Sequence, residues 1–110
     1  MRYGLKTKLD RVVDGDTVRL LVDVGFGIYS KQVIRLAGID CPELDSKDAD
    51  EKKRAYEAKR FTELFFQMQG QLEVEVTQKD PYGRWVGHVR IANVDLSEVL
   101  LREGHAKPYR

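Results

Sequence analysis

Hydrophobic and polar positions alternate along the first third of the chain, as is typical of β-strands with one buried face. Three strand-like runs cover residues 3–13, 17–24 and 28–37. The segments between them, Asp14-Gly15 and Gly25-Phe26-Gly27, favour tight turns. The pattern therefore predicts a three-stranded meander.

The apolar spacing changes to that of a helix from about Asp48 onward. The apolar stripe consists of Ala55, Ala58, Phe61, Leu64, Phe65 and Met68. Acidic residues precede this stripe and Gly70 follows it, which are signals for the start and the end of a helix. One long helix is therefore expected between the third and fourth strands.

Strand patterns return at residues 72–76 and 85–91, on either side of a turn formed by Asp80-Pro81-Tyr82-Gly83. Asp95 followed by Glu98 predicts a capped, short C-terminal helix. The order βββ-α-ββ-α favours a mainly β or α+β fold, namely a five-stranded Greek-key barrel of the OB type. Other α+β folds share this pattern.

Length and composition narrow the class of protein. The 110 residues fit one domain spanning 1–110, with 42% hydrophobic and 34% charged residues and a net charge of +1. No apolar run approaches the roughly 20 residues that cross a bilayer, and no secretory signal precedes the first strand. We expect a monomer without a membrane partner, in the cytoplasm or otherwise intracellular, with a secreted mature form left open.

Four carboxylates lie where the predicted strands end: Asp14, Asp16, Asp40 and Glu43. Oxygen-only ligands suit a hard cation such as Ca²⁺ or Mg²⁺. A zinc site is not indicated, because His88, His105 and the single cysteine, Cys41, have no metal-ligand spacing. The alternative for Asp14-Gly15-Asp16 taken alone is ordinary hairpin-turn chemistry.

Two arginines favour a site that binds both a cation and a phosphate over ordinary turn chemistry. Arg35 lies inside an apolar strand run, and Arg84 follows the turn at 80–83. A guanidinium is a two-pronged donor that matches a phosphate group, and two of them beside a cation would neutralise the charge of a phosphoryl group under attack. The alternative for each arginine alone is a surface salt bridge.

Four ordered motifs carry a family resemblance: "VVDGDTVRL", "IRLAGIDCPE", "DPYGRWVGHV" and "LLREGHAKPY". In this order and with these gaps the chain resembles the staphylococcal nuclease (thermonuclease) family. The resemblance implies an OB-fold and a nuclease that uses one Ca²⁺ ion to hydrolyse phosphodiester bonds of DNA and/or RNA by attack of water, leaving 3′-phosphates.

The resemblance also implies roles for single residues. The calcium ligands correspond to Asp16, Asp40 and the backbone carbonyl of Cys41. The catalytic residues correspond to Arg35, Glu43 and Arg84. By the same resemblance, Glu43 would orient or deprotonate the attacking water, and the two arginines would bind the phosphate. Supporting positions correspond to Asp14 and Thr17, and candidate substrate contacts to Tyr82, Lys107 and Tyr109.

The match departs from the family at Pro81, where the type enzyme has a lysine that contacts a terminal phosphate. Two other classes stay open at this point. One is a catalytically weak or inactive OB-fold module that binds nucleic acid or protein. The other is a cysteine hydrolase built on Cys41 with His88 or His105, for which no base geometry is indicated.

Overall fold

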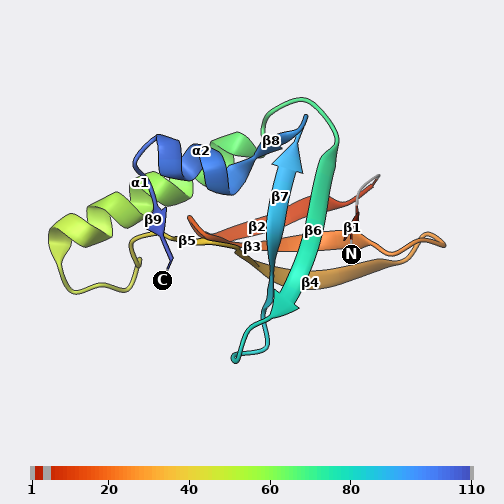
Figure 1. Ribbon diagram of the computed structural model, residues 1–110, viewed down its shortest axis with the longest axis horizontal. Coiled ribbons are helices and arrows are strands. Elements are labelled where there is room, and N and C mark those ends of the chain that lie inside the picture. Colours follow the sequence, from red (N-terminus) through yellow and green to blue (C-terminus); the bar gives the residue numbers. More distant parts are fainter. Residues whose placement is uncertain (1, 4–5, 110) are drawn as a thin grey trace.

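A computed structural model describes residues 2–3 and 6–109 of the chain (Figure 1). The strands are β1 (Arg2–Tyr3), β2 (Lys8–Asp14), β3 (Thr17–Asp23), β4 (Tyr29–Leu36), β5 (Ile39–Asp40), β6 (Leu72–Lys79), β7 (Trp85–Ile91), β8 (Val94–Asp95) and β9 (Lys107–Pro108). The helices are α1 (Ala49–Phe65) and α2 (Leu96–Arg102). The predicted α+β class, its five main strands and its two helices are confirmed.

The main sheet is mixed, with strand order β1-β6-β7-β4-β3-β2. β4 and β7 pair in parallel over residues 34–36 and 85–87, and the other ladders of this sheet are antiparallel. Figure 1 shows the β6–β7 hairpin crossing the β2–β3–β4 ribbon steeply, with both helices at the end opposite the β3–β4 loop. Within the described residues no ladder joins β2 to β1, so the predicted barrel is not closed by strand pairing.

The crossing of the two layers depends on a glycine in β7. Gly87 pairs with Val76 of β6 on one side and with Leu36 of β4 on the other. A Cβ atom at position 87 would overlap the backbone carbonyl of Glu75. Only glycine therefore lets β6 fold this closely over β7.

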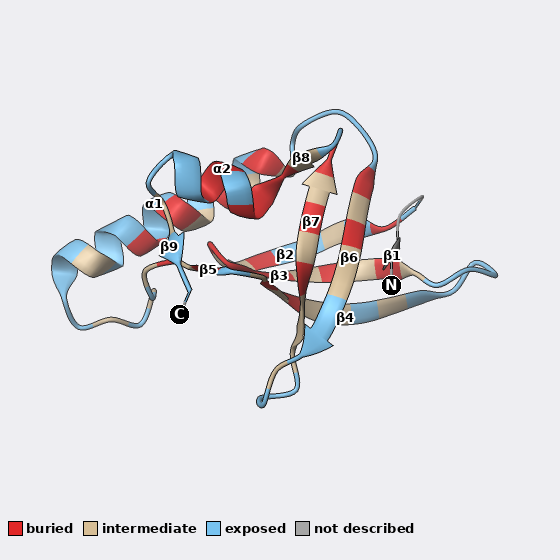
Figure 2. Cartoon of the chain, viewed as in Figure 1, coloured by how far each residue is buried: buried red, intermediate tan, exposed pale blue. Residues whose placement is uncertain are grey.

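The core lies between the sheet and the helices. β3 buries Val18, Leu20 and Val22 at alternate positions, as the period of a strand requires. Figure 2 shows further buried residues, in red, on β6, β7 and α2. Of the described part of the chain, no helix is long and apolar enough to cross a membrane.

Both helices begin at the aspartates expected from the sequence. The side chain of Asp48 accepts a hydrogen bond from the Asp50 N–H, and Asp95 accepts from the N–H groups of Ser97 and Glu98. Helix α1 buries Ala55, Ala58, Thr62 and Phe65. The prediction that Leu64 and Met68 belong to the buried stripe is wrong, because both side chains are exposed. Helix α1 ends at Phe65, before Met68, and Thr62 belongs to its buried face in place of Leu64.

The predicted single strand over residues 3–13 is wrong. Tyr3 belongs to β1, which pairs with β6, whereas β2 begins at Lys8 and pairs with β3; residues 4–5 of the predicted run lie outside the described residues. The two-residue strands β1, β5, β8 and β9 were not predicted, because they are too short to show an alternating pattern. The ladder between β5 and β9 nevertheless brings the chain's last described residues beside Asp40.

Candidate functional site

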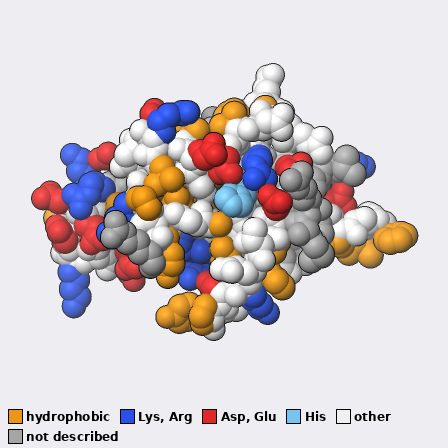
Figure 3. Space-filling view, viewed as in Figure 1, with side chains coloured by type: hydrophobic (Ala, Val, Ile, Leu, Met, Phe, Trp, Pro, Cys, Tyr) orange, Lys and Arg blue, Asp and Glu red, His pale blue; other side chains and the backbone are white. Residues whose placement is uncertain are grey.

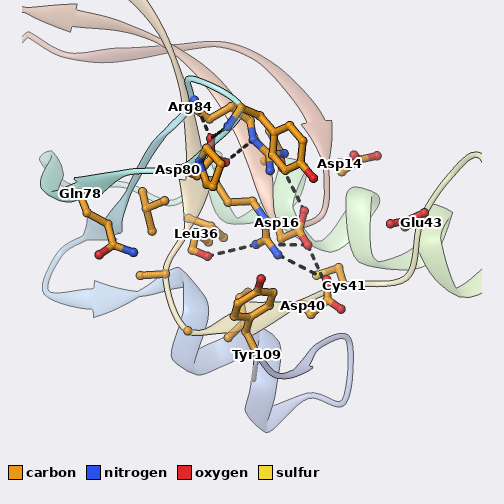
Figure 4. Close-up of a pocket in the computed structure, with 18 of the residues that line it drawn as sticks. Asp14, Asp16, Leu36, Asp40, Cys41, Glu43, Gln78, Asp80, Arg84 and Tyr109 are labelled. Atoms are coloured by element: carbon orange, nitrogen blue, oxygen red, sulfur yellow. Dashed lines mark hydrogen bonds and ion pairs between the residues drawn. The ribbon is translucent and has the colours of Figure 1, made fainter.

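A cleft of about 980 Å³ lies where the β2–β3 turn, the end of β4, the β5 segment and the β6–β7 turn meet (Figure 4). The predicted site residues that line it are Asp14, Asp16, Thr17, Arg35, Asp40, Cys41, Glu43, Tyr82, Arg84 and Tyr109. Lys107 does not line it and lies instead in a neighbouring hollow of about 450 Å³ beside α1 and the end of α2. The structure thus brings together all but one of the predicted residues.

Arg35 connects the two carboxylates that were predicted as metal ligands. Its Nη1 lies 3.4 Å from Asp16 Oδ2, and its Nη2 lies 3.3 Å from Asp40 Oδ1. Nη1 also donates to the Leu36 carbonyl at 3.1 Å, which fixes the plane of the guanidinium. The Arg35 side chain is 14% exposed and that of Asp16 10%, whereas that of Asp40 is 42% exposed, so water screens the Arg35–Asp16 pair less than the Arg35–Asp40 pair.

Asp16 is held in place from both sides. It is 7% exposed, its Oδ1 accepts a hydrogen bond of 3.0 Å from Thr17 Oγ1, and its Oδ2 accepts one of 2.9 Å from the Cys41 N–H. The second bond ties the β2–β3 turn to the β5 segment across 25 positions of sequence. Thr17 therefore contacts the predicted ligand directly, as its predicted supporting position requires.

Helix α1 also anchors the turn that carries Asp16. Thr62 is fully buried, and its Oγ1 donates a 2.7 Å hydrogen bond to the Gly15 carbonyl. Gly15 is packed closely, because a Cβ there would lie 2.8 Å from Ala58 Cβ and 3.1 Å from Cys41 Sγ. Thr62 was not among the residues predicted for the site, and a hydroxyl among the apolar residues of a helix stripe was the signal that could have found it.

Asp80 holds the second arginine, Arg84, although its sequence context predicted only a turn residue. Its Oδ2 lies 2.6 Å from Arg84 Nε, and its Oδ1 accepts from the N–H groups of Tyr82 and Arg84, both at 2.9 Å. Partial burial acts to raise the pKa of Asp80, but the hydrogen bonds from Arg84 and Tyr82 outweigh it and lower the pKa. Asp80 is thus an ionised partner that orients Arg84.

Each arginine of the cleft has an aromatic ring beside it. The Arg84 Cζ atom lies 5.6 Å from the ring centre of Tyr82, and the Arg35 Cζ atom lies 5.8 Å from that of Tyr109. Both rings are open to solvent, at 84% exposure for Tyr82 and 65% for Tyr109. A flat ligand such as a nucleobase could therefore stack on either ring without displacing core residues.

Glu43 and Asp14 lie at the margin of the cleft, and Figure 4 shows Glu43 apart from the cluster around Asp16. Nearby negative charge raises the pKa of Glu43, with Asp45 as the largest cause, followed by partial desolvation, Asp40 and Glu51. Burial raises the pKa of Asp14, and Asp16 adds to this effect. Both carboxyls thus hold protons to higher pH than usual.

The Cys41 side chain is not suited to nucleophilic chemistry. It is 5% exposed, and burial together with the charge of Asp16 raises its pKa to about 12. Neither histidine lines the cleft; His88 lies 3.1 Å from Asp95, and His105 packs on Phe61 at 4.8 Å between ring centres. A Cys41 hydrolase would therefore need a thiolate that this site disfavours.

The donor set for a cation is small and consists of oxygen. Among residues 2–3 and 6–109, no group of three or more His, Cys, Asp or Glu side chains is arranged to hold a metal ion. Asp16 and Asp40 lie within 3.4 Å of the same guanidinium, and the backbone of Cys41 adjoins both. A hard cation there would use two carboxylates, and a carbonyl, water or substrate oxygens would complete its shell.

Comparison with known proteins places this arrangement in a family. The sequence model of the staphylococcal nuclease homologue family matches residues 33–110. The chain is 34% identical over 106 residues to a thermonuclease of Staphylococcus hyicus, covering 94% of the chain and 60% of that protein. It is 31% identical over 101 residues to the endonuclease YncB of Bacillus subtilis, covering 90% of the chain and 46% of YncB.

An archaeal relative shows the same extent of similarity. The uncharacterised protein MJ1439 of Methanocaldococcus jannaschii is 31% identical over 130 residues, covering 97% of the chain and 59% of that protein. The chain spans about half to three fifths of the length of these relatives. The predicted resemblance is confirmed by the family match, and the chain belongs to the staphylococcal nuclease homologue family.

Proposed function

We propose that this protein is a calcium-dependent nuclease that hydrolyses phosphodiester bonds of DNA, RNA or both by attack of water and leaves 3′-phosphates. One observation carries the proposal: the Arg35 guanidinium lies between the Asp16 and Asp40 carboxylates in a cleft that also contains Arg84. The names of two relatives, a thermonuclease and an endonuclease, support the same reaction class.

The charge of the central trio explains why a cation and a phosphate would bind together. Asp16, Asp40 and Arg35 sum to −1, since two carboxylates face one guanidinium. A +2 cation and one phosphodiester charge of −1 bring the total to zero. Either ligand alone would leave a net charge on this trio, in which Arg35 and Asp16 are largely buried, and this is costly.

One Ca²⁺ ion would be held by Asp16, Asp40 and the Cys41 carbonyl. These ligands fit calcium, because all are oxygen atoms and Asp16 is already oriented by Thr17 and the Cys41 N–H. Bound calcium supplies positive charge next to the phosphate and lowers the pKa of a water molecule.

The two arginines would bind the phosphate from different elements. Arg35 belongs to β4, and Arg84 is the residue just before the start of β7. Asp80 engages Arg84 through Nε, so a phosphate would be bound by its terminal amino groups. Both guanidinium groups would offset the charge that builds on the phosphoryl oxygens during attack.

Glu43 would orient the attacking water and accept its proton. A base works best when its pKa lies close to the operating pH, and the neighbouring Asp45 and Asp40 charges raise the pKa of Glu43 in that direction. No protein nucleophile is needed, which agrees with the protonated, buried thiol of Cys41.

The proposal is tested by incubating plasmid DNA and a structured RNA with the protein in Ca²⁺, and in parallel with excess EGTA. Cleavage in calcium alone, with 3′-phosphate ends on the products, is the expected result. Hydrolysis that persists in EGTA would contradict the metal-assisted reaction. Binding without cleavage in either condition would favour the alternative of a non-catalytic nucleic-acid-binding module.

A further inference from the structure

The β3–β4 loop, at the end of the molecule far from the cleft, carries three exposed apolar side chains, among them the most exposed large hydrophobic residue of the described chain. Phe26 is 100% exposed, Ile28 58% and Val24 45%. Figure 3 shows hydrophobic side chains gathered at this end of the space-filling view, opposite helix α1. Water-exposed apolar groups that cluster on a protruding loop are typical of a contact surface.

The loop holds Phe26 outward in a defined conformation. Val24 N–H donates to the Ile28 carbonyl at 3.1 Å, and Ile28 N–H donates to the Gly25 carbonyl at 2.9 Å. Phe26 has a φ of 56°, a left-handed conformation that phenylalanine rarely adopts. The loop therefore displays the ring and does not simply leave it unpacked.

A basic and aromatic face connects this loop to the cleft. Burial alternates along the second half of β4, where Ile34 and Leu36 are buried and Arg35 lines the cleft. By the period of a strand, the residues on the same face as Arg35 are Val33, Lys31 and Tyr29. The strand register places Lys31 and Lys8 on either side of Leu21. The Lys8 ammonium lies 5.2 Å from the ring centre of Tyr29.

This face carries more positive charge than negative charge. Asp10 is paired with Arg19 at 2.5 Å, and Asp23 keeps its negative charge while it accepts a hydrogen bond from the Gly25 N–H at 2.9 Å, so the charges of Lys8 and Lys31 exceed that of Asp23 by one. Lys8 and Lys31 are exposed and lie between Arg35 and the loop. A polyanion leaving the cleft along β4 would therefore meet cations first and the apolar loop last.

The length of this face sets the length of the ligand. Arg35 and Tyr29 are six strand positions apart, which is about 20 Å, and the loop extends further. At roughly 3.4 Å per stacked nucleotide, about eight nucleotides reach from Arg35 to Phe26. A trinucleotide in the cleft cannot touch the loop.

We propose that the β3–β4 hairpin is a second polynucleotide-binding site, in which Phe26 stacks on an unpaired base and Lys8 and Lys31 bind the intervening phosphates. This inference rests on the proposed function, because it extends the path of the substrate from the same cleft. A polynucleotide is favoured over a membrane surface because the cations lead from the loop to the cleft, while residues 24–30 themselves carry no charge. Aromatic stacking accepts any base, as a non-specific nuclease requires.

The test measures binding of a fluorescent single strand of about 24 nucleotides, three times the length of about eight that spans the face. Binding is followed by anisotropy in EDTA, so that no cleavage is needed. Phe26→Asn removes the ring while keeping a residue that tolerates the left-handed conformation. Its affinity is expected to fall on the order of tenfold, as for loss of one stacked base, and Phe26→Tyr is expected to restore it.

Matched controls separate this effect from a general loss of aromatic or basic surface. Tyr56→Asn removes an exposed aromatic ring of α1 and is expected to bind like the wild type. Lys31→Gln is expected to reduce the slope of log affinity against log salt by about one, whereas Lys53→Gln on α1 is expected to leave that slope unchanged.

The outcomes distinguish this inference from the proposed function. If the protein cleaves nucleic acid but Phe26→Asn binds the long strand as the wild type does, the second site is wrong and the nuclease proposal stands. If no cleavage occurs but binding depends on Phe26, the second site stands alone. Phe26-dependent binding to phosphatidylserine vesicles without binding to the strand, or Phe26-dependent self-association without it, would overturn the inference.

Discussion

Replacing Thr62 by valine tests how helix α1 positions the turn that carries Asp16. Valine has nearly the shape of threonine, so the change removes the Oγ1–H that donates to the Gly15 carbonyl at 2.7 Å and leaves little cavity. Thr62 is fully buried, and the Gly15 carbonyl would lose this partner away from bulk water. The predicted cost is about 1–3 kcal/mol of unfolding free energy.

The assay is thermal unfolding followed by circular dichroism, without added metal. For a domain of about 100 residues, each kcal/mol lowers Tm by roughly 4–8 °C, so Thr62→Val is expected to unfold at least about 4 °C below the wild type. Thr62→Ser keeps the hydroxyl and loses one methyl group, which costs about 1 kcal/mol. A valine variant as stable as the wild type would refute the role of this hydrogen bond.

A second readout concerns the site itself. Gly15 precedes Asp16, whose Oδ2 accepts from the Cys41 N–H at 2.9 Å, so a displaced turn would also displace one of the two carboxylates. Calcium affinity measured by calorimetry is therefore expected to fall for Thr62→Val more than for Thr62→Ser. Equal affinities with unequal stabilities would show that Thr62 supports the fold and not the cation site.

Three other changes probe different parts of the account. Gly87→Ala should lower the free energy of unfolding measured in urea by about 1–3 kcal/mol, because the added Cβ overlaps the Glu75 carbonyl, and an unchanged free energy would contradict the close crossing of β6 and β7. Cys41→Ser should keep most nuclease activity, since the buried thiol has a pKa of about 12; loss of hydrolysis in a folded, calcium-binding variant would contradict this. Asp45→Asn removes the largest cause of the raised pKa of Glu43, so an NMR titration of the calcium-free protein should show the Glu43 pKa moving down towards the ordinary value of a glutamate, and no movement would contradict the assignment.

The main elements could be predicted because their signals are local. Alternation along β3, the helical pattern from about Asp48 and the Asp95 cap of α2 need only a few neighbouring residues, and the structure confirms them. The split between β1 and β2 could not be predicted, because it depends on the pairing of β1 with β6, about 70 positions away. The same holds for the non-closed sheet and for the role of Gly87, which arise from the angle at which the two layers cross.

The candidate site was accessible from sequence because its residues sit in short motifs at the ends of strands. The supporting contacts were not, since Thr62 and Gly15 are 47 positions apart and meet only after α1 packs on the turn. Lys107 pairs in register with Asp40 in the β5–β9 ladder but lines only the neighbouring hollow, so its predicted contact with substrate stays a prediction.

The role of Arg35 is tested most directly by initial rates of hydrolysis of a single-stranded DNA in saturating Ca²⁺. The comparison is among the wild type, Arg35→Ala, and Arg60→Ala, which removes an exposed arginine of α1 at 64% side-chain exposure. We predict that Arg35→Ala lowers the rate on the order of 10³-fold or more with a folded protein by circular dichroism, while Arg60→Ala keeps the wild-type rate. Wild-type rates for a folded Arg35→Ala would contradict the central claim that Arg35, between Asp16 and Asp40, binds the phosphate that is cleaved.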